Sequence, residues 1–232
     1  MENNQEIIAG EPITSLAALS RDASNVSVYT TDTLLSEIAK SRVFLPYIKI
    51  AGAQAKEVSK KVCSAGDFLM TRGKDDVVKL GEKFECVPLA FRVKATVFTA
   101  DDKVLSYFDP TTKEFQDTRE KSKVFDNGCM FGVECLLWVP EHETFATWFA
   151  YNVTALNEIN SIRSRTGQLS ILKSKLIETK KFNWYGPQVL PCSNPYKEPD
   201  LNLAASTIKE FNNPKSSEVE VAEEGTADAR AR

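Results

Sequence analysis

The segment at residues 82–98, "EKFECVPLAFRVKATVF", constrains the fold more strongly than any other part of the sequence. Apolar side chains stand at every second position along it, and this period of two is typical of a β-strand with one side buried. The pattern predicts the clearest strand of the chain and divides its side chains between two faces. One face carries Val87, Leu89, Phe91, Val93, Ala95 and Val97, and the other carries Pro88, Ala90, Arg92, Lys94 and Thr96.

Two hairpins are predicted from turn residues between apolar runs. The "ADD" at 100–102 indicates a turn, so "KVLSYF" at 103–108 is expected to return beside the first strand. A second hairpin joins "CMFGVECLLWVP" at 129–140 to "ETFATWFAYN" at 143–152 through the turn Glu141-His142-Glu143. Because both faces of this hairpin are apolar, we expect it at the centre of the sheet.

The period then changes to that of a helix. In "NVTALNEINSIRSRTG" apolar residues recur every three positions, Asn152 or Thr154 is suited to the N-cap, and Gly167 to the end. Residues 169–191 return to the alternation of a strand, and "DLNLAASTIKEFNN" predicts a short terminal helix. The expected fold is therefore α+β and mainly antiparallel, from about residue 46 to 190, with a helix near 153–165 lodged between strands.

The charge is uneven along the chain, whose net charge is −3. Residues 1–40 hold six acidic and two basic residues (net −4), and residues 214–232 hold five and three (net −2), so the rest is net +3. We expect an acidic, partly disordered segment at 1–42, one domain at 43–212, and a disordered acidic tail at 213–232. The tail either solubilises the protein or competes with a polyanion for the basic body.

Composition points to a folded protein of a reducing compartment. The content of 42% hydrophobic and 26% charged residues is ordinary for a globular domain. The longest apolar runs, such as "CLLWV" and "WFAYNV", are far shorter than the roughly 18 residues of a membrane helix, so we expect no membrane partner. The N-terminus lacks the features of a signal peptide, and five cysteines are an odd number for a disulfide framework. A cytoplasmic location is expected.

Residues that carry catalysis are mostly missing. The single histidine, His142, stands in a predicted turn, which excludes a site built on two or more histidines. The chain has no CxxC, Walker or GxGxxG motif, and Cys129 and Cys135 are expected to be small core residues. Acidic pairs such as those at 75–76 and 101–102 are typical of solvated turns. We therefore expect no enzymatic activity, no metal and no cofactor.

Basic and aromatic residues gather instead on the predicted strands and around the helix. Single-stranded nucleic acid is bound by this combination, because cations offset phosphates while aromatic faces stack on bases at about 1–3 kcal/mol per base. In the alternative interpretation the aromatic residues are core and the basic residues form a solvated face. The candidate contacts are Arg92, Lys94, Trp148, Tyr151, Arg163, Arg165, Lys173, Lys175, Lys181, Trp184 and Tyr185.

A further set of candidates follows the first predicted strand. "LPYIKI" at 45–50 alternates as a strand, and "AGAQAKEVSKK" then forms a loop before "GDFLMT" resumes the sheet. In a small five-stranded barrel such loops flank the binding groove. Lys56, Lys60 and Lys61 are thus candidates for phosphate contacts, with a solvated loop as the simpler alternative.

The order of these segments, from "LPYIKIAGAQAKEV" through "AGDFLMTR", "EKFECVPLAFRVKATVF" and "LLWVP" to "NVTALNEINSIRS" and "KSKLIETKKFNWYGPQVLP", resembles tailed-phage single-stranded-DNA-binding proteins. The resemblance covers roughly residues 43–212 and implies an OB-like barrel with an inserted helix and a C-terminal helix. It also implies a protein that coats single-stranded DNA during replication or recombination, with replication or recombination proteins as partners through the tail. The tail departs from the pattern, because it ends in "ADARAR" instead of an acidic-aromatic tip.

Two other classes of function fit the same sequence features. A virion structural or assembly protein needs a strand-rich body and no catalytic residues. A nuclease or other phage enzyme of DNA metabolism could use scattered acidic residues with a divalent metal.

Overall fold

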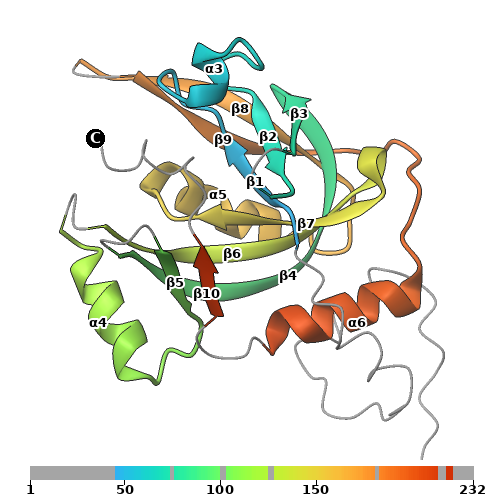
Figure 1. Cartoon of the computed structure of the whole chain (residues 1–232). Coiled ribbons are helices and arrows are strands. Elements are labelled where there is room, and N and C mark those ends of the chain that lie inside the picture. The colour runs from blue at the N-terminus through green and yellow to red at the C-terminus, as the bar shows by residue number, and fades with distance from the viewer. Residues whose placement is uncertain are drawn as a thin grey trace, which may run out of the picture.

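A computed structural model describes residues 45–73, 76–99, 103–124, 128–180, 183–213 and 218–221 (Figure 1). The predicted N-terminal segment at 1–42 and the predicted turn at 100–102 lie outside these residues. The described elements are β1 (Tyr47–Ile50), α3 (Lys56–Ser59), β2 (Phe68–Thr71), β3 (Val77–Gly81), β4 (Lys83–Phe98), β5 (Lys103–Tyr107), α4 (Lys113–Lys121), β6 (Cys129–Val139), the 3-10 turn η1 (Pro140–His142), β7 (Thr144–Ala150), α5 (Val153–Arg163), β8 (Ser170–Glu178), β9 (Asn183–Pro191), α6 (Leu201–Asn212) and β10 (Glu218–Val221).

The strands confirm the predicted α+β class. They follow the order β10-β5-β4-β6-β7-β1-β2-β3, and the β8–β9 hairpin joins through β4. Neighbouring strands are antiparallel except at β1 and β7, which are parallel. The two predicted hairpins are present as β4–β5 and β6–β7, and the latter lies in the middle of the sheet as expected.

The strand β4 joins the two parts of the sheet. Its first residues pair with β8, most of its length pairs with β6, and its last residues pair with β5. The register with β6 shifts between Pro88 and Ala90. Proline has no N–H to give to a strand ladder, so it is tolerated at such a bulge. Unbroken alternation was the wrong expectation here, because Ala90 packs in the same cluster as Val87 and Leu89.

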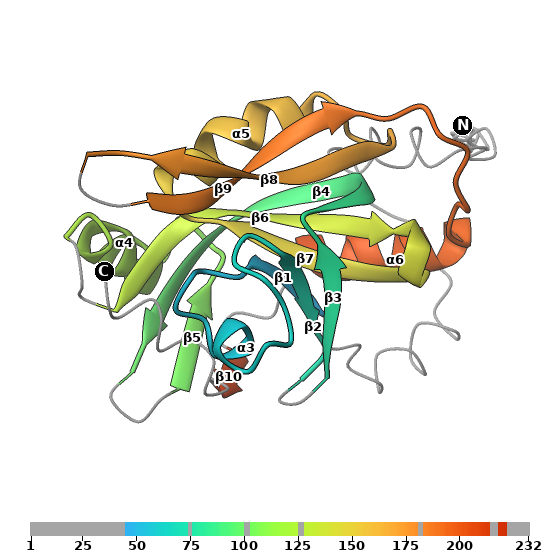
Figure 2. The same cartoon turned by 90° about the horizontal axis from the view of Figure 1, so that it is seen from above.

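The sheet is open and does not close into the barrel that the sequence analysis predicts. The strands at the two ends of the order, β3 and β10, each pair with one neighbour among the described strands. β3 leads into β4 through the single residue Glu82, and its partner among the described strands is β2 and not β4. The place beside the start of β4 is taken by β8, so an inserted hairpin lies where closure would be needed (Figure 2).

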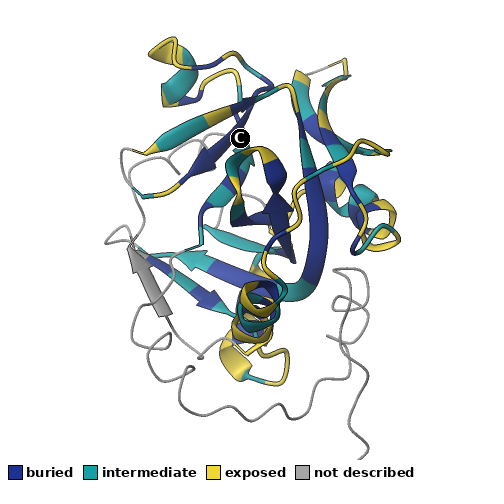
Figure 3. Cartoon of the chain, turned by 90° about the vertical axis from the view of Figure 1, so that its right-hand side faces the viewer, coloured by how far each residue is buried: buried dark blue, intermediate teal, exposed yellow. Residues whose placement is uncertain are grey.

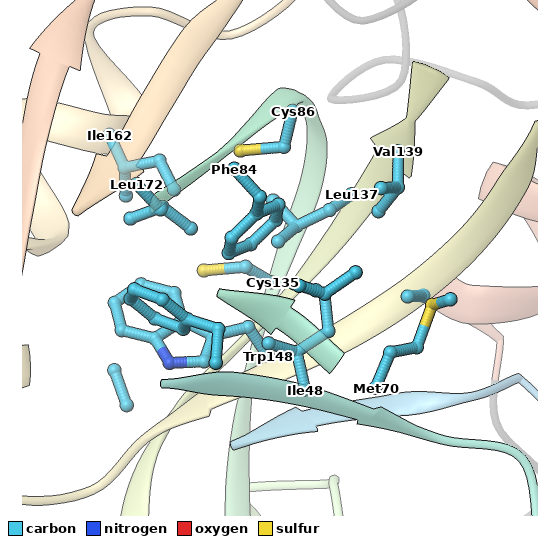
Figure 4. Close-up of a cluster of buried hydrophobic side chains, with 14 of the residues drawn as sticks. Ile48, Met70, Phe84, Cys86, Cys135, Leu137, Val139, Trp148, Ile162 and Leu172 are labelled. Atoms are coloured by element: carbon cyan, nitrogen blue, oxygen red, sulfur yellow. The ribbon is translucent and has the colours of Figure 1, made fainter. Parts of the chain in front are cut away.

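Two buried clusters occupy opposite sides of the β4–β6 region, where α5 and α6 lie (Figure 1). The larger contains Trp148, Cys135 and Leu172 together with residues of α5 (Figure 4). The second places Phe211 and Ile208 of α6 against Val87 and Leu89. Both faces of the central strands are therefore buried, while exposure concentrates on helices and loops (Figure 3).

The predicted helices are confirmed, and their caps explain where they begin. Asn152 accepts a hydrogen bond from the Ala155 N–H at 2.8 Å at the start of α5. Asp200 accepts one from the Leu203 N–H at 2.9 Å at the start of α6. Each cap satisfies a backbone donor that has no partner within the helix.

Residues 169–191 form two strands instead of the single one expected. β8 and β9 pair from Ser170 with Pro191 to Glu178 with Asn183, so the chain reverses between them. Reversal changes which residues share a face: Trp184 lies opposite Ile177, and not on the side of Leu176.

Part of the predicted disordered tail is also in the sheet. The residues of β10, Glu218–Val221, pair antiparallel with β5 at one end of the strand order.

Among the described residues, no helix is long and apolar enough to cross a membrane.

Candidate nucleic-acid interface

Arg92 and Lys94 share one face of β4, as predicted, but that face is covered. Glu134 of β6 accepts a hydrogen bond from Arg92 Nε at 2.7 Å and another from Lys94 Nζ at 3.0 Å. The Arg92 guanidinium lies between two rings, 3.9 Å from the centroid of Phe108 and 4.1 Å from that of Phe211. Its Nη1 also donates to the Phe211 carbonyl oxygen at 2.6 Å. Both cations are thus occupied within the fold and are not placed to contact phosphate.

The electrostatics of this cluster favour an ionised Glu134. Burial raises the pKa of its carboxyl group, but the charges of Lys94 and Arg92 and their hydrogen bonds lower it by more. The net pKa lies below the ordinary value of 4.5. One carboxylate therefore holds two cations at the point where α6 meets the sheet.

The two aromatic residues predicted on β7 and just after it have different surroundings. Trp148 is 3% exposed and packs in the larger core cluster beside Cys135 (Figure 4). Predicting it as a stacking residue was wrong, because strand position alone does not distinguish a core indole from a surface one. Tyr151 is 44% exposed, and its ring centroid is 5.6 Å from that of Phe149.

The two arginines at the end of α5 also have different surroundings. Arg165 donates from Nε to the Ser170 hydroxyl at 2.8 Å and from Nη2 to the Leu169 carbonyl at 3.1 Å. It therefore holds the connection from α5 to β8 in place. Arg163 is exposed, with its guanidinium 5.9 Å from the centroid of the Phe91 ring.

Two further predicted cations, Lys173 and Lys175, lie on the sheet formed by the start of β4, β8 and β9. Lys173 is paired with Lys83 of β4 on one side and with Gln188 of β9 on the other, so the three side chains share a face. Lys175 lies two residues further along β8 and Trp184 beyond it on β9, which places both on this face. We call Lys83, Lys173, Lys175, Trp184 and Gln188 the basic face.

Contacts within the structure fix the indole and leave the lysines exposed. Trp184 Nε1 donates to the Thr154 hydroxyl of α5 at 3.1 Å, and the side chain is half-buried. Lys83, Lys173 and Lys175 are exposed, and none makes an ion pair with a described residue. Cations at this spacing, beside an aromatic ring, are suited to a phosphate backbone with an adjacent base.

The last two predicted residues are Lys181 and Tyr185. Lys181 lies outside the described residues. Tyr185 pairs with Leu176 on the opposite face of the hairpin, where its ring packs against Gly66. A β-carbon built on Gly66 would lie 2.6 Å from the Tyr185 ring, so this close approach requires glycine.

Lys83 and Gln188 were missed by the sequence analysis. Lys83 follows Glu82 at the start of β4, in a segment that the sequence analysis assigned to the core strand. Lys83 lies close to Lys173 because β4 pairs with β8, although the two residues are 90 positions apart in the sequence. No local sequence pattern predicts that pairing.

A hollow of about 180 Å³ opens beside the basic face. It lies between α5 and the hairpin, with Thr154, Asn157 and Glu158 on one side and Lys175, Ile177, Pro187 and Gln188 on the other. Glu158 also accepts a hydrogen bond from the Val189 N–H at 3.2 Å, so α5 satisfies a donor of β9. The hollow is open to solvent on one side, so a group lying in it would be partly surrounded by these residues.

The lysines of the loop after β1 belong to a different region from the basic face. Lys56 begins the short helix α3, and Lys60 and Lys61 follow it, all three exposed. The loop is held by Asp67, which accepts from the Ser64 N–H at 2.7 Å and forms an ion pair with Lys79 at 2.8 Å. Burial raises the pKa of Asp67, but its bonds to Lys79 and Ser64 lower it by more.

Within the described part of the chain, no group of three or more His, Cys, Asp or Glu residues is arranged to hold a metal ion. His142 is half-buried in η1, and Cys135 is buried in the core.

Comparison of the chain with protein-family models, curated proteins and solved structures finds no match.

Proposed function

We propose that the protein binds single-stranded nucleic acid through the basic face, as a phage-type single-stranded DNA-binding protein without catalytic activity. One observation carries the proposal: Lys83, Lys173 and Lys175 lie on one face without ion-pair partners among the described residues, next to the anchored indole of Trp184. Elsewhere the pairs Arg92–Glu134 and Lys79–Asp67 neutralise cations internally. Unpaired cations clustered beside an aromatic side chain support a polyanionic ligand.

The spacing supports contact with successive phosphates. Lys173 and Lys175 are two residues apart on one strand, about 7 Å along the sheet. Lys83 extends the row sideways onto β4. Each phosphate contact releases counterions, so binding weakens as salt rises.

An OB-type relationship is part of the same proposal. OB folds are partly open barrels that bind oligonucleotides on a strand face, and a curved antiparallel sheet with α5 between β7 and β8 supports the relationship. Coating of DNA in replication or recombination, in the cytoplasm of a host, and recruitment of partner proteins by the tail complete the proposed role.

The proposal is tested by titrating fluorescently labelled oligo-dT with the protein and measuring anisotropy at about 50 mM and about 200 mM salt. Lys173→Ala and Lys175→Ala should each flatten the log-log salt dependence by roughly 0.7 per lost phosphate contact. Trp184→Ala should weaken binding by about 1–3 kcal/mol through lost stacking, while Trp184→Phe keeps a stacking ring.

The control is Lys113→Ala, which removes an exposed lysine of α4 away from the basic face. It should leave affinity and salt slope unchanged. Each variant is first shown to melt like the wild type. If the wild type does not bind oligo-dT, or if folded variants of the basic face behave like the control, the proposal is wrong.

A virion structural or assembly role is the second candidate, and one observation favours it. Leu176 is 43% exposed on the β8–β9 hairpin, whose closed end projects from the body in Figure 1. An exposed apolar side chain on a projecting hairpin suits a protein partner. Co-purification with particles, together with no binding of oligo-dT, would support this role over the first.

A further inference from the structure

The hollow between α5 and the β8–β9 hairpin has the size of a small ring. Its volume of about 180 Å³ is well above the roughly 10–15 Å³ that a single water molecule requires. Sites for drug-sized ligands are larger, at about 300–1,000 Å³. The hollow therefore suits one planar group better than a whole nucleotide or a larger cofactor.

The lining determines which kind of ring fits. Ile177 and Pro187 contribute apolar surface to the lining, and Asn157 and Gln188 contribute two side-chain amides. Neither of these amides has a hydrogen bond to another residue in the part of the chain that the structure describes. An amide offers both donors and an acceptor, which matches the polar edge of a nucleobase.

Glu158 makes the hollow unsuitable for phosphate. Its carboxylate repels an anion, so the flanking lysines are the place for phosphates and the hollow is the place for a neutral group. One oxygen accepts from the Val189 N–H at 3.2 Å, but a carboxylate can accept several hydrogen bonds. The remaining capacity favours a ligand that donates, such as the exocyclic amino group of cytosine or adenine. Uracil carries the acceptor O4 at the position of that amino group, which a carboxylate repels, so only its N3–H can donate.

We propose that this hollow takes one base of the bound strand and prefers a base with an exocyclic amino group, with Glu158 as the acceptor. The inference rests on the proposed function and deepens it from sequence-independent coating to a base preference. Lys175, which lies both on the basic face and at the hollow, holds the flanking phosphate.

The test compares two pyrimidine oligomers, oligo-deoxycytidine and oligo-deoxyuridine. Their bases differ at the exocyclic group and at N3, so a difference in affinity reports on the hydrogen-bonding edge. The wild type should bind oligo-dC about five-fold or more tightly than oligo-dU, which corresponds to the lower end of the discrimination by one well-placed base contact. The same preference should persist at both salt concentrations, because it does not depend on phosphates.

Glu158→Gln keeps the size of the side chain and an oxygen for the Val189 N–H, but it offers a donor where the carboxylate offers only acceptors. It should remove most of the preference for oligo-dC while leaving the salt slope unchanged. Asn157→Ala, at an exposed position of α5, should also reduce the preference and provides a second variant if Glu158→Gln unfolds. Asn202→Ala, exposed on α6, is the matched control and should retain the preference.

The outcomes separate this inference from the proposed function. Equal, salt-dependent binding of both oligomers by the wild type overturns the base preference and leaves the proposed function standing. A preference that survives in both variants shows that the base is read elsewhere and also overturns it. Absence of binding to either oligomer overturns the inference and the proposed function together.

Discussion

At the scale of single residues, Glu134 compensates the charge of two cations inside the fold. It is 3% exposed and is the shared partner of Arg92 and Lys94. Removing one member of a buried ion pair leaves the others without compensation, at a cost of about 3–5 kcal/mol. Glu134→Gln should therefore lower the free energy of unfolding at pH 7 by about that amount, measured by urea denaturation.

The pH dependence gives a second measurement on the same variant. Because the folded pKa of Glu134 lies below its ordinary value of 4.5, ionisation of this group stabilises the fold fully above that value. The contribution is lost as the pH falls through the lower folded pKa. The difference in stability between the wild type and Glu134→Gln should thus shrink under acid conditions. A constant difference across this range, or an effect no larger than that of Asp117→Asn on exposed α4, would contradict the prediction.

Single residues also show where prediction from sequence ends. The period of β4 correctly placed Arg92 and Lys94 on one face, but their partner is 40 or more positions away and has no local signature. Trp148 and Trp184 both stand in strands beside other aromatic or apolar residues, yet one is core and the other half-buried at the surface. Burial is decided by which elements pack on a face, and that information is not local.

At the scale of elements, Gly132 fixes how closely β6 and β7 approach. A β-carbon at this position would lie 2.0 Å from the Ala150 carbonyl oxygen, a backbone atom that cannot move aside. Gly132→Ala should therefore cost more than the 1–3 kcal/mol typical of overpacking, because strands rather than side chains must shift. Thermal and urea denaturation both measure the loss.

Gly81→Ala supplies the matched comparison, since it tests conformation without crowding. Gly81 has φ +83° and no atom within 4 Å of a built β-carbon. Only the left-handed backbone is strained, at roughly 1–2 kcal/mol. If Gly132→Ala proves no less stable than Gly81→Ala, then β6 and β7 are less tightly joined than the structure indicates.

Helices and strands with a clear hydrophobic period were predictable from the sequence, but the pairing of the strands with one another was not. The change from a period of two to about 3.6 located α5, and Asn152, one of the two expected N-cap residues, caps it in the structure. The reversal between β8 and β9 was missed, because alternation continues through "SKLIETKKFNW" without a Gly-containing turn. Barrel closure failed as a prediction for a related reason: the pairing of β8 with β4 is non-local.

At the scale of the whole molecule, the acidic tail has two separable features. Its charge can compete with a bound polyanion, and its strand β10 pairs with β5 at the edge of the sheet. Residues 214–221 and 222–232 each carry a net charge of −1, from one basic against two acidic residues and two against three. Only the first of these segments contains β10, which pairs with β5. Two truncations therefore separate charge from strand pairing: removal of 222–232 removes acidic charge and keeps β10, whereas removal of 214–232 also removes the strand that pairs with β5.

If the tail competes with nucleic acid for the basic body, both truncations should tighten binding of oligo-dT at about 0.01 M salt, and the longer one about twice as much in free energy. The gain should fade near 0.15 M, where the screening length shortens from about 30 Å to about 8 Å. Only the longer truncation should self-associate in sedimentation velocity, because an unpaired strand edge invites another chain. If the affinity stays unchanged at low salt, the tail does not compete with nucleic acid and serves only to solubilise the protein. If the longer truncation remains monomeric, β10 does not protect the edge of β5 from pairing with another chain.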